Sequence, residues 1–362
     1  MKNEAAFIEG CLLSLDGQVD EIVVVDTGST DGTQDIVRRF NCKLLEFEWQ
    51  HDFSAARNFG LNHAKSDWIL YIDADERLTV DASHKLGSLL RNDCVAYRIK
   101  FQPRTDTTYY DEMRLFRCDP RIRFSGSMHE TMIPAVQEVA ASDGLLIANE
   151  YRVAIRHLGY DGSQLHKHER NIPLLETAIQ QDPSRVYLRF HLGYTLDEID
   201  RLDEASVQLQ KGIQLARNSG SSEQVRMEGS MCAHILCMIY LRRGSPADAI
   251  KTAHEGLELY SKNTTLQWAL ARALLADDDA EGAIALLHPL LVHDPESFFD
   301  PRVAYAKSLF LEDVPSTLGA AYFKLERFAD AAFQYECALA ANPDNREYKT
   351  KLVLCRAKSA RR

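Results

Sequence analysis

The chain has 362 residues, which is more than one compact core usually organises, so its length predicts two domains. With 45% hydrophobic and 26% charged residues, the composition is typical of a globular protein and excludes wholesale disorder. The formal net charge of −11 disfavours a nucleic-acid partner, and any phosphorylated ligand must therefore be met by local cations or a metal.

Two further features bear on location. The sequence has no signal peptide and no apolar run long enough to cross a bilayer. Its eight cysteines include no C-x-x-C pair, and several lie among apolar neighbours, where a reduced cysteine acts as a small core residue. We expect a cytoplasmic protein, and attachment to the inner membrane face through a surface helix stays open.

Up to about residue 160, short apolar runs alternate with helical stretches. The runs predict strands at residues 21–26, 44–47 and 68–73, with helices at 33–40 and 54–64 between them. Weaker alternation predicts two more strands, around residues 95–101 and 153–157. Runs that are apolar on both faces are typical of parallel strands buried between helices, so we expect an α/β domain with a mostly parallel sheet over residues 1–163.

From about residue 164 to the end, the pattern predicts helices alone. Four similar small-residue corners, at residues 202–205, 246–249, 280–283 and 328–331, each lie between two amphipathic stretches. Asp-Pro or Asn-Pro breaks recur at residues 182–183, 294–295 and 342–343. This half resembles tetratricopeptide repeats, in which small residues let paired helices approach closely.

The most prominent candidate site is the segment Asp73, Ala74, Asp75, Glu76 at the end of an apolar run. On an extended strand, Asp73 and Asp75 would lie on one side, at the carboxyl end where open α/β sheets bind ligands. Neighbouring carboxylates repel unless a cation lies between them, and a divalent ion bridging to a diphosphate fits. A solvated acidic turn that caps the next helix is an equally weighted alternative.

Two other segments support a ligand. Asp26 ends an apolar run, and the small residues that follow, among them Thr27 and Gly28, would let a backbone approach a nucleotide; a plain turn with Ser29 or Thr30 as helix N-cap is the alternative. Arg57 lies in the first turn of a predicted helix, where the helix dipole disfavours a cation. An anionic ligand would explain a cation at this position. The alternative for Arg57 is an ion pair with Asp52 or Asp31.

Together these segments resemble glycosyltransferase family 2, which has the GT-A fold. The motifs that carry the resemblance arrive in the family's order: residues 2–4, 25–33, 52–58 and 68–76. Farther on, residues 114–117, Gly126, residues 129–130 and 155–160 are similar to a subgroup with appended tetratricopeptide repeats, which includes peptide S-glycosyltransferases of bacteriocin pathways. The resemblance covers roughly the first 160 residues and the repeats.

The resemblance implies a role for each matching residue. Glu4, Asp26 and Asp31 match positions that hold the nucleoside, usually uridine, and Arg57 matches one near the base or the diphosphate. Asp73 and Asp75 match the metal–diphosphate motif, with Ala74 between them, and His157 matches a late histidine that joins the metal and the diphosphate. Glu130 matches the catalytic carboxylate. His129 and Arg114 would line the gap between donor and acceptor.

The implied reaction is inverting transfer from a UDP-sugar, or another NDP-sugar, with Mg²⁺ or Mn²⁺ bound through Asp73 and Asp75. Glu130 would deprotonate an acceptor, which is unidentified; the repeats suit a peptide, a protein or a second copy of the chain. One alternative is a non-catalytic adaptor that retains a degenerate transferase domain. A glycoside hydrolase is another, although Asp73 and Asp75 are too close along one strand for the acid and base of an inverting hydrolase.

The start of the sequence departs from the family pattern. The family has an apolar strand before residues 2–4, central in the sheet between the strands that end at Asp26 and Asp73. Without that first strand, two buried strands would keep unpaired backbone groups, which is costly. We therefore expect a domain that is truncated at its N-terminus: a start called too late, which the intact downstream motifs favour, a fragment, or a degenerate relative. If the chain truly starts at Met1, we expect low stability and weak activity.

Overall fold

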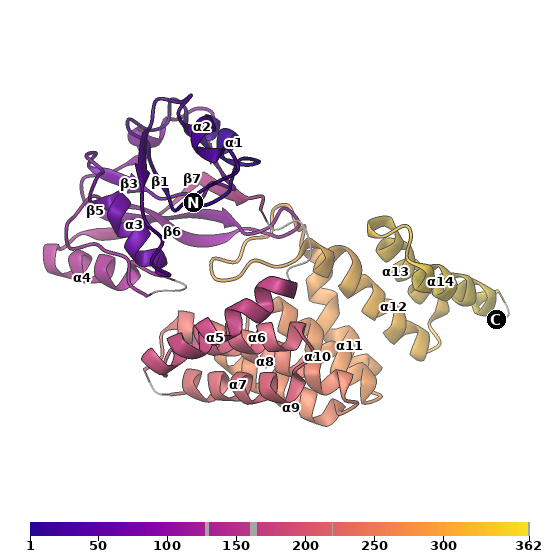
Figure 1. The fold of residues 1–362 in the computed structure, drawn as a ribbon. Helices are drawn as coiled ribbons and strands as arrows, with labels where there is room; N and C mark the ends of the chain where they lie inside the picture. Colours follow the sequence, from indigo (N-terminus) through magenta and orange to yellow (C-terminus); the bar gives the residue numbers. More distant parts are fainter. Residues whose placement is uncertain (127–129, 160–164, 219, 361–362) are drawn as a thin grey trace. The chain divides into compact units, whose positions relative to one another are not determined.

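The computed structural model describes residues 1–126, 130–159, 165–218 and 220–360, with side chains from residue 171 onward in the third range. The chain divides into two compact units, Met1–Gly162 and Ser163–Arg362 (Figure 1).

The first unit contains strands and helices. Its strands are β1 (Val23–Asp26), β2 (Lys43–Glu46), β3 (Trp68–Leu70), β4 (Glu76–Val80), β5 (Cys94–Gln102), β6 (Tyr110–Arg117) and β7 (Leu146–His157). Its helices are α1 (Ile8–Leu15), α2 (Thr33–Val37), α3 (Phe53–Leu61), the 3₁₀-helix η1 (Leu86–Leu89) and α4 (Ile133–Asp143). The strands predicted at residues 21–26, 44–47, 95–101 and 153–157 are confirmed, with shifted bounds.

The expectation of a mostly parallel sheet is wrong for the described strands. β1 and β2 pair in parallel, while the larger sheet has the order β3-β6-β5-β7-β4 and only β5 and β7 pair in parallel within it. β5 and β6 follow each other through a short connection, which favours antiparallel pairing because a parallel pair needs a long crossover. The unit is therefore an α/β region with a mixed arrangement of strands.

The two strands that precede the candidate acids, β1 and β3, lie in different sheets. The amino group of Met1 donates to the carbonyl oxygen of Val25 at 2.9 Å, and the amide of Thr27 donates to the carbonyl oxygen of Met1 at 2.9 Å. Met1 thus runs along β1 in the manner of a parallel neighbour. In the described strands, β3 pairs with β6 alone.

Two apolar clusters cover the two faces of the larger sheet. On one face, Tyr97, Ile99 and Leu115 pack with Ile155. On the other, Val95 and Phe116 pack against α4 through residues such as Val136. β5 supplies both clusters, Val95 to one face and Tyr97 and Ile99 to the other, and the register of its pairing with β7 shifts between Cys94 and Ala96. The larger sheet is therefore packed on both faces, which holds the ends of its strands in place.

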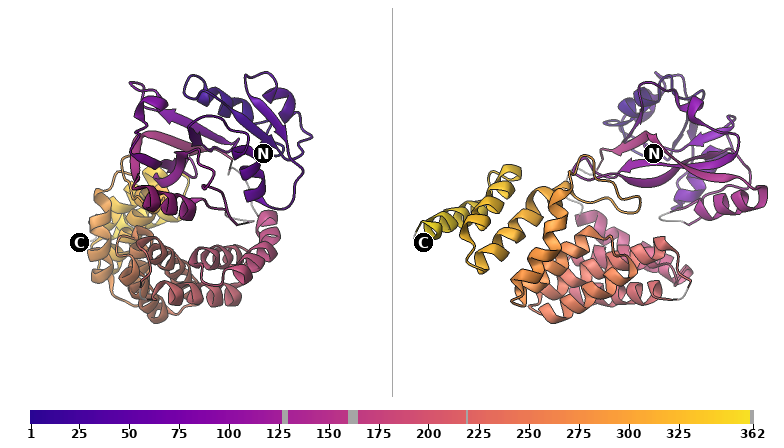
Figure 2. Two further views of the ribbon diagram at one scale, coloured as in Figure 1. Left: turned by 90° about the vertical axis from the view of Figure 1, so that its left-hand side faces the viewer. Right: turned by 180° about the vertical axis from the view of Figure 1, so that it is seen from behind.

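The second unit is entirely helical in its described residues (Figure 2). Its α-helices are α5 (Leu165–Gln181), α6 (Val186–Glu198), α7 (Leu202–Ala216), α8 (Glu223–Arg242), α9 (Pro246–Leu259), α10 (Thr264–Ala276), α11 (Ala280–Leu287), α12 (Val314–Lys324), α13 (Phe328–Ala341) and α14 (Arg346–Ser359). A 3₁₀-helix, η2 (His288–Val292), and a π-helix, η3 (Leu309–Asp313), lie between α11 and α12.

The predicted helix pairs are confirmed. The four small-residue corners form the first turns of α7, α9, α11 and α13, each of which is the second helix of a pair. The Asp-Pro and Asn-Pro breaks fall between α5 and α6, after η2, and between α13 and α14. The long spacing between the last two corners is taken up by the segment that contains η2 and η3.

Close helix contacts in this unit depend on glycine. A Cβ added to Gly256 of α9 would lie 2.4 Å from the Cβ of Ala233 on α8 and 2.6 Å from Cδ2 of Leu266 on α10. Contacts this short require the neighbouring helices to move apart, and overpacking of this kind costs about 1–3 kcal/mol.

We therefore expect Gly256→Ala to lower the free energy of unfolding of the helical unit by about 1–3 kcal/mol in chemical denaturation. Lys251→Ala, at an exposed position of the same helix, is the control and should leave stability nearly unchanged. Equal stability of the two variants would show that the helices do not approach as closely as described.

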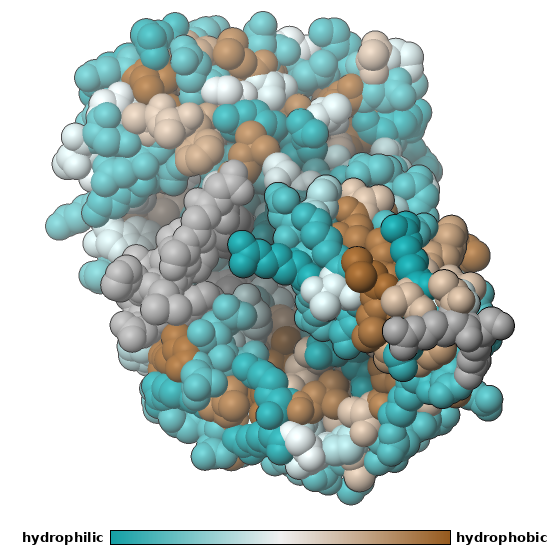
Figure 3. All heavy atoms as spheres, turned by 90° about the vertical axis from the view of Figure 1, so that its right-hand side faces the viewer, coloured by the Kyte–Doolittle hydropathy of each residue, from teal (hydrophilic) through white to brown (hydrophobic). Residues whose placement is uncertain are grey.

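The described helices include none that combines the length and the apolar composition needed to pass through a bilayer. Some large hydrophobic side chains are exposed, among them Val292, Phe333 and Val353. On the face drawn in Figure 3, hydrophobic side chains form small patches separated by hydrophilic ones, which is ordinary for folded proteins.

Candidate active site

The candidate acids Asp73 and Asp75 lie on a turn rather than on a strand. β3 ends at Leu70, and residues 73–76, which we call the acidic turn, lead directly into β4. Strand alternation therefore does not govern these side chains. The carboxylate of Asp73 contacts Arg57, whereas that of Asp75 contacts His157. The two acids thus have different partners.

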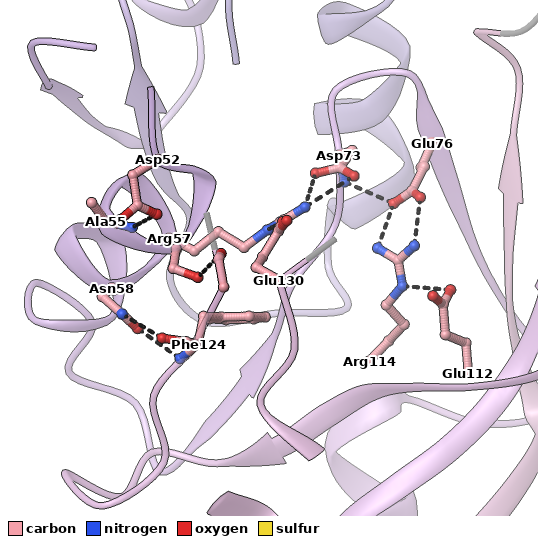
Figure 4. A network of polar contacts seen from close by, with 12 residues as sticks. Asp52, Ala55, Arg57, Asn58, Asp73, Glu76, Glu112, Arg114, Phe124 and Glu130 are labelled. Atoms are coloured by element: carbon pink, nitrogen blue, oxygen red, sulfur yellow. Dashed lines mark hydrogen bonds and ion pairs between the residues drawn. The ribbon is translucent and has the colours of Figure 1, made fainter. Parts of the chain in front are cut away.

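Arg57 joins two carboxylates that are distant in sequence. Its Nη2 lies 3.0 Å from Oδ1 of Asp73, and its Nε lies 2.5 Å from Oε1 of Glu130 (Figure 4). Burial lowers the pKa of Arg57, but Asp73 and Glu130 outweigh it and raise this pKa above the usual value. The predicted alternative, an ion pair with Asp52 or Asp31, is wrong, because Asp52 caps α3 by accepting from the amide of Ala55.

Helix α3 also holds the segment that leads to Glu130. The side chain of Asn58 donates to the carbonyl oxygen of Phe124 and accepts from its amide, both at 2.9 Å. The hydroxyl of Ser54 donates to the carbonyl oxygen of Gly126 at 2.6 Å. Arg57 therefore meets Glu130 because its neighbours on the helix fix the approach of that loop.

We expect Asn58→Ala to loosen this attachment. The substitution leaves the amide and the carbonyl of Phe124 without their partner, at a cost of about 1–3 kcal/mol. Thermal unfolding should show the loss, and limited proteolysis should cleave faster near residues 124–130. Asn62→Ala, one turn later, removes a single contact to Arg123 and should have a smaller effect on both measurements.

The second acid, Asp75, pairs with His157 at the end of β7. Nε2 of His157 lies 3.0 Å from Oδ2 of Asp75, and both side chains are partly exposed, at 12% and 21%. Burial lowers the pKa of His157, but the hydrogen bond to Asp75 and the charges of Asp75, Glu76 and Asp73 together raise it above the usual value. A Cβ on Gly159 would approach Oδ2 of Asp75 to 2.0 Å, so a larger residue at position 159 would displace this carboxylate.

The fit of a divalent ion rests on this pair. A carboxylate oxygen and an imidazole nitrogen in contact are suitable ligands for Mn²⁺ and, through the oxygen, for Mg²⁺. Burial and then the nearby Asp75 carboxylate raise the pKa of Glu4, although the amino group of Met1 acts in the opposite direction, so several negative charges lie near this pair. Among the residues that the structure describes, no three acidic, histidine or cysteine side chains gather into a complete metal site. An ion would need further ligands from the substrate.

Arg114 lies in the interior. Its side chain is 6% exposed and contacts Glu76 and Glu112, at 2.9 Å in each case. Burial raises the pKa of Glu76 to about 7, although Arg114 acts in the opposite direction. The expectation that Arg114 lines a gap between donor and acceptor does not match this placement, because its guanidinium is engaged by the two glutamates. The sequence pattern does not predict the contact between Glu76 and Arg114. The only signal for Glu76 is its place directly after Asp75.

The residues after β1 form a loop that is hydrogen-bonded both within itself and to residues 1–5. The buried carboxylate of Asp26 accepts from the amides of Gly28 and Ser29, from the hydroxyl of Ser29 and from the side chain of Gln34. Burial opposes these bonds, but together they lower the pKa of Asp26. Helix α2 begins after Gly32, so the alternative of Ser29 or Thr30 as its N-cap is wrong.

Three other predicted binding residues belong to the same loop or to the acidic turn. Asp31 accepts from the amide of Ala5 at 3.0 Å and from the amide of Thr33 at 3.0 Å. The hydroxyl of Thr27 donates to the carbonyl oxygen of Met1. Ala74 is buried at 8% exposure between the two acids. The remaining predicted residue, His129, lies outside the described residues.

Comparisons with known proteins find matches in both parts of the chain. Residues 1–135 match the profile of the family "Glycosyl transferase family 2", and residues 240–309 match a "Tetratricopeptide repeat" profile.

Several relatives share part of the sequence. A "TPR repeat-containing protein" of Synechococcus elongatus is 34% identical over 60% of this chain and 56% of its own length. The "SPbeta prophage-derived glycosyltransferase SunS" of Bacillus subtilis is 31% identical over 58% of this chain and 51% of its own length. The "Lipopolysaccharide core biosynthesis glycosyltransferase LpsC" of Rhizobium meliloti is 29% identical over 40% of this chain and 59% of its own length. The chain thus spans about half the length of the curated relatives it matches.

Proposed function

Because the chain carries a glycosyltransferase family 2 domain followed by tetratricopeptide repeats, we propose that it transfers a sugar from a UDP-sugar to an acceptor. We also propose the GT-A fold and nucleotide-sugar binding for residues 1–163, and acceptor or partner binding for residues 164–362. The proposal concerns the activity of the whole protein, and the site geometry is its support.

The observation that carries the proposal is the bridge that Arg57 makes between Asp73 and Glu130. Three segments far apart in sequence place one cation and two carboxylates at the end of β3. The Arg57 side chain is still 24% exposed, so an anionic group can reach it. A diphosphate would compete for the guanidinium, whose planar fork suits phosphate oxygens. Binding of the donor would then release the Glu130 carboxylate from its ion pair.

Asp75 and His157 would hold the divalent ion, next to Asp73, whose carboxylate is engaged by Arg57. A bound Mg²⁺ or Mn²⁺ stabilises the negative charge that develops on a leaving diphosphate. The remaining ligands would be diphosphate oxygens, since the described residues do not complete a site by themselves. Gly159 leaves room for the Asp75 carboxylate in this arrangement, because a larger residue there would displace it.

Glu130 is our candidate for the catalytic base. Once free of Arg57, its carboxylate would take the proton from the acceptor as the acceptor attacks the anomeric carbon, on the face opposite the leaving UDP. The anomeric carbon passes through an oxocarbenium-like state, and in-line attack inverts its configuration. Glu130 is 12% exposed, which limits its access to bulk water. His129, its neighbour in sequence, stays a predicted contributor to the acceptor side.

The acceptor is proposed only as a class. The repeats suit an extended peptide or a protein surface, and a second copy of the chain is a further candidate. Two of the three relatives described above are named as glycosyltransferases, and the name of one of these refers to lipopolysaccharide core biosynthesis. A carbohydrate acceptor is therefore an additional candidate. Acceptor preference is best sought with peptide and saccharide mixtures after the donor is known.

The alternative function is a non-catalytic adaptor, favoured by the split between the β1–β2 sheet and the larger sheet. A calorimetric titration of UDP, with and without Mn²⁺, separates the two functions. We expect UDP to bind, and to bind more tightly with Mn²⁺. No binding of UDP under either condition would favour the adaptor.

A further inference from the structure

The acidic turn is closed by two reciprocal hydrogen bonds. The amide of Asp73 donates to Oε2 of Glu76 at 2.7 Å, and the amide of Glu76 donates to the carbonyl oxygen of Asp73 at 3.0 Å. Glu76 is 1% exposed, so its carboxylate cannot exchange these contacts for water. The side chain of Glu76 therefore fixes the backbone from which Asp73 and Asp75 project.

Arg114 in turn fixes the carboxylate of Glu76. Its Nη1 and Nη2 donate to the two carboxylate oxygens at 3.1 and 2.9 Å, and its Nε donates to Glu112 at 2.9 Å (Figure 4). The guanidinium also lies 4.5 Å from the ring centroid of Tyr71 and 4.6 Å from that of Phe101. A bidentate pair held between aromatic rings permits one orientation of the carboxylate.

The same aromatic ring connects this pair to the exposed part of the site. Arg57 lies 5.0 Å from the centroid of Tyr71, so both arginines contact one ring. Displacement of Arg114 would thus disturb the acidic turn through Glu76, and Arg57 through Tyr71. The buried pair is thus linked to Asp73 and Asp75 through the turn and to Arg57 through Tyr71.

We propose that Glu76, oriented by Arg114, is a positioning residue that sets the conformation of the acidic turn for binding the metal–diphosphate group. The assignment of the two acids rests on the proposed function, whereas the fixing of the turn rests on the contacts above. Outer-shell partners of this kind orient the ligands, and their loss typically costs about 10- to 100-fold in metal affinity.

The competing explanation is that the pair merely stabilises the core, and a second pair in the same unit provides the control. Glu150 and Arg152 on β7 form a bidentate pair with contacts of 2.7 and 2.6 Å, and Glu150 is 6% exposed. None of their described contacts reaches the acidic turn. Glu150→Gln thus removes a bidentate ion pair on a buried glutamate, with a half-exposed arginine, without touching residues 73–76.

The test compares Glu76→Gln with Glu150→Gln in hydrogen–deuterium exchange of the metal-free protein. A glutamine cannot accept from the Asp73 amide and from both Arg114 nitrogens at once, so Glu76→Gln should speed exchange in residues 71–78 by about tenfold or more. Glu150→Gln should leave that segment unchanged. Arg114→Lys, which keeps the charge and loses the bidentate contact, should shift exchange in the same direction and guards against a variant that fails to fold.

Mn²⁺-dependent UDP binding supplies the second measurement. We expect Glu76→Gln to weaken it about 10- to 100-fold and Glu150→Gln to leave it unchanged, whatever each does to the melting temperature. Unchanged exchange in residues 71–78 for both Glu76→Gln and Arg114→Lys would overturn the proposal, as would equal effects of Glu76→Gln and Glu150→Gln on UDP binding. Faster exchange in a protein that never binds UDP would instead leave the turn assignment standing and remove the transferase function.

Discussion

Glu130→Gln is expected to abolish most sugar transfer while leaving donor binding intact. The amide oxygen of glutamine can still accept from Nε of Arg57, so the bridge between α3 and the loop persists. The amide cannot accept a proton from the acceptor, and loss of a general base typically costs about 10²- to 10⁴-fold in rate. Turnover of the UDP-sugar and calorimetric binding of UDP with Mn²⁺ measure the two effects separately.

The matched control is Glu138→Gln, an exposed glutamate on α4 in the same unit. It removes the same charge and should leave both measurements unchanged. Transfer at the parent rate by Glu130→Gln would assign the base to another residue. A loss of UDP binding in this variant would mean that Glu130 serves to hold Arg57 rather than to move a proton.

Asp75→Ala is expected to abolish most of the metal-dependent turnover of the UDP-sugar. The variant loses the carboxylate in contact with His157, and the remaining Asp73 is already engaged by Arg57. Loss of an outer-shell partner typically costs about 10- to 100-fold, so we expect the loss of Asp75, a direct ligand, to lower turnover at a fixed Mn²⁺ concentration at least about 100-fold. Because Asp75 is partly exposed and its contacts are at the surface of the unit, the melting temperature should change little.

Asp81→Ala gives the comparison for this variant. Asp81 also pairs with a histidine, His84, at 3.5 Å on the surface of the same unit. Its loss should alter neither the Mn²⁺ requirement nor the rate. If Asp75→Ala turned over donor as well as Asp81→Ala does, the acidic turn would not hold the metal.

Sequence patterns predict helices and strands well where the signal comes from neighbouring residues. Alternation and apolar runs located most strands, and the small-residue corners located the second helix of four pairs. The acids after β1 and β3 were found because an acid that ends an apolar run is conspicuous. These signals depend on near neighbours in the chain, which is why a single sequence reveals them.

Long-range partners were not predictable in the same way. Arg57 pairs with Glu130, 73 residues later, and Glu76 pairs with Arg114, 38 residues later. No periodicity links such positions, since their meeting depends on strand order. The antiparallel pairing of β3 with β6 illustrates this, because a short apolar strand has the same composition in either direction. The prediction that strand alternation places Asp73 and Asp75 on one side does not apply, because the strand ends three residues before Asp73.

Release of UDP from UDP-sugars tests the central claim most directly. The protein is incubated with a panel of UDP-sugars and with Mn²⁺ or EDTA, beside the Asp75→Ala and Glu130→Gln variants. The account predicts that at least one donor yields UDP with Mn²⁺ only, and that both variants release it at least about 100-fold more slowly. Release that is equal in EDTA, or equal among the three proteins, would contradict it.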